Sequence, residues 1–280
     1  MRVDVIDCAA RHPVAKLDAA PAIIGLTMRF DAGEQVAVIG PSGAGKTTLL
    51  HVIACALKPS SGRIELAGSD PWQVDARALR ALRGDLFLAA QVPPLPPRQR
   101  VVTAVLAGRL PNLSLWQSIR SLFYPAQMEL AADALSRFDL DEKLFDRVDR
   151  LSGGERQRVG LARGLVTSAK LLLVDEPLSA LDPTRSEQAV SALTTAARER
   201  GATLIATLHQ VDTALRHFPR IIGLRDGALA FDLPASEVTP EILRELYAQK
   251  LHELAGPAID ASSFADTPAA PTQPAVMHCR

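Results

Sequence analysis

Gly40-Pro41-Ser42-Gly43-Ala44-Gly45-Lys46-Thr47 is the most informative stretch of this chain. The apolar run 35–39 before it has the composition of a buried strand, and residues 46–57 after it place apolar side chains at helical spacing. Glycines let successive backbone N–H groups turn toward a phosphate chain, and a helix N-terminus adds positive potential. In this context the pattern GxxxxGKT predicts a phosphate-binding loop, with Lys46 near the β- and γ-phosphates, Thr47 as a Mg²⁺ ligand and Thr48 beside them. A glycine-rich turn with an exposed lysine is the alternative.

Two acids follow a fully apolar run at residues 171–174, namely Asp175 and Glu176. Ligands of open α/β sheets bind at the carboxyl ends of the strands, so this position differs from that of ordinary surface acids. We expect Asp175 to hold a metal ion through water and Glu176 to polarise an attacking water molecule. The alternative is a capped strand end without a chemical role.

A second candidate anion site is the sequence Leu151-Ser152-Gly153-Gly154-Glu155. Ser152 and Glu155 have capping-box spacing, so the segment could be a helix cap and nothing more. However, Gly153 and Gly154 leave backbone donors at this helix N-terminus open to an anion.

The three motifs, in this order, resemble the ATPase subunits of ABC transporters over about residues 1–250. The resemblance implies an α/β fold with a P-loop NTPase (RecA-like) core, a small antiparallel β subdomain and an inserted α-helical subdomain. It places the ATPase domain at 1–255 and the helical lobe at about 92–165. It also implies ATP and Mg²⁺ as cofactors and a head-to-tail dimer with a second copy, in which Ser152, Gly153 and Gly154 close over the γ-phosphate held by the partner.

Further positions match the family one by one. Gln91 falls where the family has a glutamine that senses Mg²⁺ and water, and Asp182 ends a segment similar to the loop that crosses the dimer. His209 resembles the histidine that contacts the γ-phosphate, although a lone histidine after a strand is usually structural. The family commonly stacks an aromatic residue on adenine near the end of the first strand; this chain has His12 there, which either stacks through its imidazole or leaves adenine without a partner.

The remaining elements follow from local patterns. We expect strands at 3–6, 22–30 and 203–208, a helix at 76–83 that starts near Asp70-Pro71 and stops at Gly84, and a proline-rich connector at 91–97. Helices should fill 101–145, with breaks at Pro111 and Pro125, and recur at 186–200 and 240–254. Asp226-Gly227 predicts a hairpin turn, and the composition of 256–280 predicts a disordered tail.

Composition limits the partners and the location. The 31 Lys and Arg residues balance 31 Asp and Glu residues, so we expect no nucleic-acid partner. Three cysteines without metal-ligand spacing favour a reducing compartment. We expect no secretion signal and no membrane span. The resemblance therefore places the chain at the cytoplasmic face of the inner membrane, as a peripheral subunit.

The transported solute follows from resemblance alone. The segments 105–110, 121–124 and 207–216, together with Trp116, are similar to the phosphonate-import branch of the family. This similarity implies permease subunits as partners and, indirectly, a solute-binding protein. In the family a permease helix enters a groove between the core and the lobe, and apolar lobe residues either contact it or form the lobe's own core: Leu113, Leu115, Trp116, Leu122, Phe123 and Tyr124.

Three other functions compete with this interpretation. One is an importer ATPase for a different small solute, and another is a soluble ABC ATPase that works on DNA or in a non-transport assembly. The sequence has neither a long coiled-coil insertion nor a basic stripe, which speaks against the second. The third, an inert regulatory module, conflicts with the intact Lys46, Asp175 and Glu176.

Overall fold

The computed structural model describes residues 1–12, 20–123, 127–178 and 180–248. Its larger sheet has six strands in the order β5-β6-β7-β3-β8-β9. The first five strands in this order run parallel to one another, and the sixth, β9, is antiparallel to β8. Every residue of β3, β6 and β7 is buried, as expected for parallel strands covered on both faces. The strands are β3 (Gln35–Ile39), β5 (Leu86–Ala89), β6 (Leu171–Asp175), β7 (Thr203–Thr207), β8 (Arg220–Arg225) and β9 (Ala228–Pro234).

The smaller sheet is antiparallel, in the order β2-β1-β4. Its strands are β1 (Val3–Ala10), β2 (Ile23–Phe30) and β4 (Ser61–Leu66). Buried side chains of this sheet pack in one apolar cluster with residues of helix α1 (Lys46–Ile53), which follows β3. The expected α/β fold with a small antiparallel sheet beside a parallel core is confirmed.

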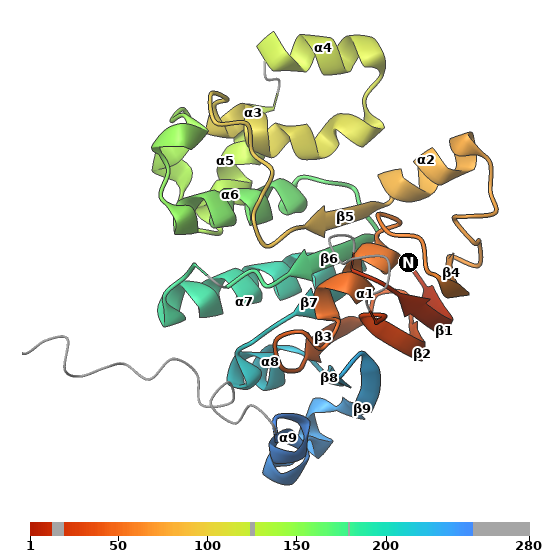
Figure 1. Ribbon diagram of the computed structural model, residues 1–280. Helices are drawn as coiled ribbons and strands as arrows, with labels where there is room; N and C mark the ends of the chain where they lie inside the picture. Colours follow the sequence, from red (N-terminus) through yellow and green to blue (C-terminus); the bar gives the residue numbers. More distant parts are fainter. Residues whose placement is uncertain (13–19, 124–126, 179, 249–280) are drawn as a thin grey trace, which may run out of the picture.

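The helices gather on both sides of the larger sheet, and α3, α4 and α5 lie together beyond edge strand β5 (Figure 1). Helices α3, α5 and α6 pack on one another, and α6 also contacts β5. Short 3₁₀ segments occur at 107–112 (η1), 141–143, 148–150 and 235–237. The remaining helices are α2 (Ala76–Gly84), α3 (Val101–Leu106), α4 (Leu115–Phe123), α5 (Met128–Ser136), α6 (Gly153–Leu165), α7 (Pro183–Arg200), α8 (Val211–His217) and α9 (Pro240–Leu246).

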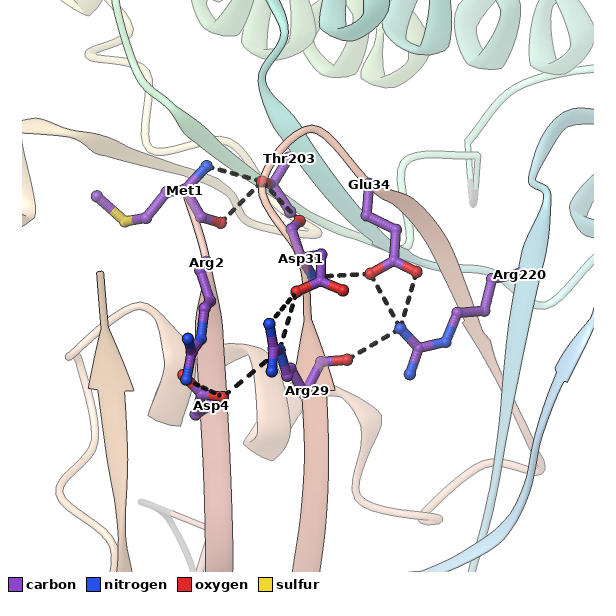
Figure 2. Close-up of polar contacts among 8 residues, drawn as sticks. All are labelled: Met1, Arg2, Asp4, Arg29, Asp31, Glu34, Thr203 and Arg220. Atoms are coloured by element: carbon purple, nitrogen blue, oxygen red, sulfur yellow. Dashed lines mark hydrogen bonds and ion pairs between the residues drawn. The ribbon is translucent and has the colours of Figure 1, made fainter. Parts of the chain in front are cut away.

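Polar contacts tie the smaller sheet to the larger one (Figure 2). The amino group of Met1, just before β1, donates to Thr203 Oγ1 of β7 at 2.8 Å and to Lys170 O at 3.1 Å. Arg220 of β8 donates to both carboxylate oxygens of Glu34 at 2.9 Å and to the backbone carbonyl of Arg29 in β2 at 2.9 Å. Arg220 therefore joins the larger sheet to β2 and to the residue before β3.

Several local expectations are corrected by the structure. The helix at 76–84 is capped by Asp75, whose side chain accepts from Ala78 N, and Asp70-Pro71 lies in the preceding turn. Helix α1 ends at Ile53 rather than near residue 57, and Pro111 lies inside a 3₁₀ helix rather than at a break.

Helix α7 begins three residues earlier than expected, because Pro183 fits the first helical position and Asp182 caps it. The connector at 91–97 and the turn at Asp226-Gly227 are confirmed, the latter with positive φ at both residues. Pro125, the end of the expected helix 240–254 and the tail 256–280 lie outside the described residues. Within the described part of the chain, no helix has the length and apolar character that crossing a membrane requires.

Candidate nucleotide site

The glycine loop lies between β3 and α1, as its sequence context predicts. Gly40 and Gly45 have φ of 147° and 97°, and a Cβ on them would lie 2.1 Å from Leu224 O and 2.4 Å from Ala22 O. Only glycine fits these two positions. The loop folds over Lys46, whose Nζ donates to Gly40 O at 2.7 Å, so the ammonium group is already positioned inside the loop.

Two of the predicted metal ligands, Thr47 and Asp175, meet beside this loop. Thr47 Oγ1 lies 3.1 Å from Asp175 Oδ1, although the two residues are 128 positions apart. Thr207 Oγ1 donates to the same carboxylate oxygen at 2.7 Å, which orients Asp175. Among the residues that the structure describes, no group of three or more His, Cys, Asp or Glu side chains is arranged to hold a metal ion. A hydroxyl beside a carboxylate instead offers the hard oxygen ligands that Mg²⁺ binds, so the residues present fit this ion.

Glu176 is the centre of the polar contacts at the site. Its Oε1 lies 2.6 Å from His209 Nε2, and its Oε2 accepts from Gln91 Nε2 at 3.0 Å. Lys46 Nζ is 4.0 Å from Oε1. The structure thus brings together four predicted catalytic residues that come from four separate segments of the chain.

Hydrogen bonding keeps this carboxyl group ionised. The hydrogen bond from His209 lowers the pKa of Glu176 below its usual value, and the nearby charges of His209 and Lys46 act in the same direction, whereas burial opposes them. The side chain is 14% exposed, so water can still reach it. An ionised, partly accessible carboxylate can accept a hydrogen bond from a water molecule and orient it.

The backbone of Glu176 is held in an uncommon conformation. Its φ is 46°, which is rare outside glycine, asparagine and aspartate. Glu176 N donates to Thr207 Oγ1 at 2.9 Å, and Glu176 O accepts from Gln157 Nε2 at 3.0 Å. Such a residue persists because the surrounding contacts determine its position, and such strain gathers at functional sites.

Thr207 and Gln157 also support the site, although neither is among the residues predicted from the sequence. Gln157, on α6, is 3% exposed and also accepts from Ala180 N at 3.2 Å. It therefore joins α6 to the segment that follows β6. No sequence pattern singled out Gln157, because α6 also buries the charged Arg158 beside it. Finding Thr207 requires knowing that β6 and β7 are neighbours with Asp175 opposite Thr207.

Ser152, Gly153 and Gly154, called the signature residues below, begin α6, and Ser152 and Glu155 do form a capping box. Ser152 Oγ accepts from Glu155 N, and a Glu155 carboxylate oxygen accepts from Ser152 N at 2.7 Å. A Cβ on Gly153 would meet nothing within 4 Å, whereas one on Gly154 would lie 2.8 Å from Ala180 O. Helix α6 packs on β5, and two strands, β6 and β7, separate β5 from β3 and its glycine loop.

Two further predicted residues lie near the ends of other elements. His12 is exposed directly after β1, and residues 13–19 that follow lie outside the described part of the chain. The side chain of Asp182 accepts from Arg185 N at 3.0 Å and so caps α7. Ser179, near Asp182, also lies outside the described residues.

Comparison with known proteins identifies clear relatives. The family model described as "ABC transporter" matches residues 23–179. The chain is 69% identical, over all 280 residues and the full relative, to the phosphonates import ATP-binding protein PhnC of Polaromonas sp. strain JS666. It is 52% identical over 263 residues, 93% of this chain and 94% of the relative, to phosphonates import ATP-binding protein PhnC 2 of Pseudomonas aeruginosa strain UCBPP-PA14.

Solved structures show the same architecture. The ATP-binding cassette MJ0796, in a dimeric post-hydrolysis state bound to ADP and Pi, superimposes with a TM-score of 0.71 at 26% identity, over 83% of this chain and 98% of that one. A bacterial Atm1-family ABC exporter with ATP bound gives 0.71 at 26% identity, over 89% of this chain and 41% of that one.

Proposed function

Since the chain belongs to the ABC transporter family, we propose that it is the ATP-hydrolysing subunit that energises a phosphonate importer. The observation that carries the proposal is the 69% identity, over the full length of both chains, to a phosphonates import ATP-binding protein. The cluster of Lys46, Gln91, Glu176 and His209 supports the hydrolytic part, because it joins a cation for phosphate to an ionised carboxylate for water.

In this proposal the loop residues Gly40 to Thr48 hold the phosphates of ATP. The backbone N–H groups and the Lys46 ammonium neutralise phosphate charge, and Thr47, Asp175 and Gln91 hold Mg²⁺. Mg²⁺, when bound, adds positive charge beside the β- and γ-phosphates. Glu176 orients the attacking water, while His209 and Gln91 hold the two carboxylate oxygens in place. Phosphoryl transfer depends mainly on such positioning and charge stabilisation.

A second copy of the chain completes the site. Helix α6, which begins with Ser152, Gly153 and Gly154, packs on β5, whereas the glycine loop follows β3. Strand β3 is the third strand from β5 in the sheet, and neighbouring strands are about 4.8 Å apart. We propose that these signature residues, with Asp182, act on the ATP of a head-to-tail partner. The dimeric state of MJ0796 supports this arrangement.

We further propose that permease subunits dock on the helical lobe, at the cytoplasmic face of the inner membrane. A cavity of about 190 Å³ lies where β5, the proline connector and α6 meet, and its lining includes Pro93, Leu95 and Gly160. On α4, Leu115 and Trp116 are 79% and 74% exposed, so they do not form the lobe's core. The predictions for the side chains of Leu122, Phe123 and Tyr124 lie outside the described residues.

An ATPase assay on the purified chain tests the hydrolytic proposal. Glu176→Gln should reduce kcat by roughly 100-fold or more while ATP binding persists, because the change removes the carboxylate that orients water and keeps its shape. Lys46→Ala should abolish ATP binding. Parent-like hydrolysis by Glu176→Gln would refute the proposed mechanism.

Sedimentation of Glu176→Gln with ATP should show a dimer, and Ser152→Arg should prevent its formation.

Growth with a phosphonate as sole phosphorus source tests the solute. Deletion of this subunit should abolish growth, and the parent gene, but not the gene for Glu176→Gln, should restore it. Growth of the deletion strain at the normal rate would favour the alternative of a different small solute, provided that the purified protein still hydrolyses ATP. If the ATPase rate of the purified protein is the same with and without permease-containing membranes, a non-transport ATPase would be favoured.

A further inference from the structure

The end of helix α9 reaches the glycine loop through the buried side chain of Tyr247. Tyr247, the residue after α9, is 1% exposed, and its phenolic oxygen accepts a hydrogen bond from Gly40 N at 3.2 Å. The two residues are 207 positions apart in the sequence. The first glycine of the loop is thus in contact with the last helix of the described chain.

Gly40 is closely surrounded by other parts of the chain. A Cβ on it would lie 2.1 Å from Leu224 O of β8, and its N–H group donates to the Tyr247 hydroxyl. A buried N–H group without a partner costs free energy comparable to a lost hydrogen bond, so the phenol both satisfies this donor and fixes the start of the loop.

The same glycine holds the lysine of the site. Lys46 Nζ donates to Gly40 O at 2.7 Å, so the contacts run from Tyr247 to Gly40 and from Gly40 to Lys46. A shift of Gly40 would change the position of the ammonium group that the proposed mechanism places on the phosphates. Tyr247 contacts the loop at the backbone N–H group of Gly40.

Contacts that do not involve the glycine loop also hold the end of α9 in place. Arg225 Nη1 donates to Glu245 O at 2.7 Å, and Leu246 is 2% exposed. Figure 1 shows α9 beside β8 and β9, at the end of the sheet opposite the helical lobe. The phenol is therefore carried by a helix that is fixed to the hairpin β8–β9.

We propose that Tyr247 is a positioning residue of the ATP site, which holds Gly40, and through it Lys46, in the conformation that binds phosphate. This inference rests on the proposed role of the glycine loop in holding ATP. It makes the docking of α9 a determinant of ATP affinity.

Tyr247→Phe tests the inference, because phenylalanine keeps the buried ring and removes only the hydroxyl. We expect KM for ATP to rise about 3- to 10-fold, the effect of one lost hydrogen bond, with a smaller change in kcat. The rise in melting temperature on adding ATP should shrink in the same variant. Glu241→Gln, an exposed change on α9 whose carboxylate pairs with Arg244, is the control and should leave both quantities unchanged.

The outcomes separate this inference from the site assignment. A lower melting temperature of Tyr247→Phe without ATP, with KM and the ATP-induced shift unchanged, would reduce Tyr247 to a packing role and overturn the inference. ATP binding by Lys46→Ala at parental affinity would instead overturn the assignment of the loop. If Tyr247→Phe does not fold, Arg225→Gln loosens the same helix end and should raise KM in the same direction; an unchanged KM there overturns the inference.

Discussion

At the scale of single residues, one hydroxyl supports both acids of the site. Thr207 Oγ1 donates to Asp175 Oδ1 and accepts from Glu176 N. The same atom therefore orients the proposed metal ligand and stabilises the left-handed backbone of Glu176. The catalytic geometry depends on a neighbouring strand end as much as on the acids themselves.

Thr207→Val should lower kcat by about 10-fold, because the isosteric change leaves the Glu176 N–H and one Asp175 oxygen without this partner, at about 1–3 kcal/mol for an unsatisfied group. Steady-state ATPase kinetics measure the effect. Thr207→Ser keeps the hydroxyl and is the matched control. Equal kcat in the valine and serine variants would contradict the role assigned to the hydroxyl.

The lowered pKa of Glu176 predicts how stability depends on pH. The pKa of a glutamate in an unfolded chain is about 4.3. The pKa of Glu176 in the folded protein is lower, so as pH falls the unfolded chain binds this proton before the folded protein does. The ionised group therefore stabilises the fold above that pH, and its contribution is lost as pH falls through the folded pKa. Below about pH 4.3 the parent should lose free energy of unfolding faster than Glu176→Gln, as denaturant titrations at each pH would measure. Parallel curves would refute this.

At the scale of elements, glycines set how closely the lobe packs. Gly108, in η1, faces α6, and a Cβ there would lie 2.4 Å from Arg163 O and 3.0 Å from a Val166 methyl group. Because the first contact is with backbone, a rotamer change cannot relieve it. The approach of η1 to α6 therefore depends on the absence of a side chain at residue 108.

Gly108→Ala should destabilise the chain by about 1–3 kcal/mol, the usual cost of overpacking a close contact. Gly84→Ala is the control: a Cβ there lies 3.9 Å from its nearest neighbour, Pro111, and alanine favours a helix. Urea denaturation compares the two variants. A Gly108→Ala protein as stable as Gly84→Ala would show that η1 can move away from α6 without cost.

At the scale of the whole molecule, Arg220 joins the two sheets. Its guanidinium binds Glu34 and Asp232, and it lies 5.7 Å from the centre of the Phe30 ring in β2. Its side chain is 22% exposed, and these hydrogen bonds raise the pKa of Arg220. Removing it would leave two partly buried carboxylates without their shared cation.

Arg220→Met should therefore lower the free energy of unfolding by about 2–4 kcal/mol, toward the cost of breaking a buried ion pair. Arg244→Met is the control, because Arg244 is exposed and forms a surface pair with Glu241, worth about 0–1 kcal/mol. Thermal and urea denaturation measure both. Equal losses in the two variants would show that the two sheets do not depend on this arginine.

Short stretches of sequence were enough to predict the local chemistry: the glycine loop, the acids after an apolar strand, the capping box and the hairpin turn. Each depends on backbone conformation or spacing within a few residues, which composition and periodicity reveal. The resemblance to ABC ATPases placed Gln91 and His209, and the structure brought both to Glu176. Their roles, those of the signature residues and that of His12 stay predictions.

Only the tertiary structure could show that Thr207 supports both acids, that Gln157 holds the Glu176 carbonyl and that Tyr247 holds Gly40. These contacts join residues up to 207 positions apart, and no local pattern marks a threonine or a tyrosine as the partner of a distant backbone group. Strand order and helix docking create such pairs. The phosphate loop is thus encoded locally, whereas the contacts that hold it in position arise from the packing of the whole chain.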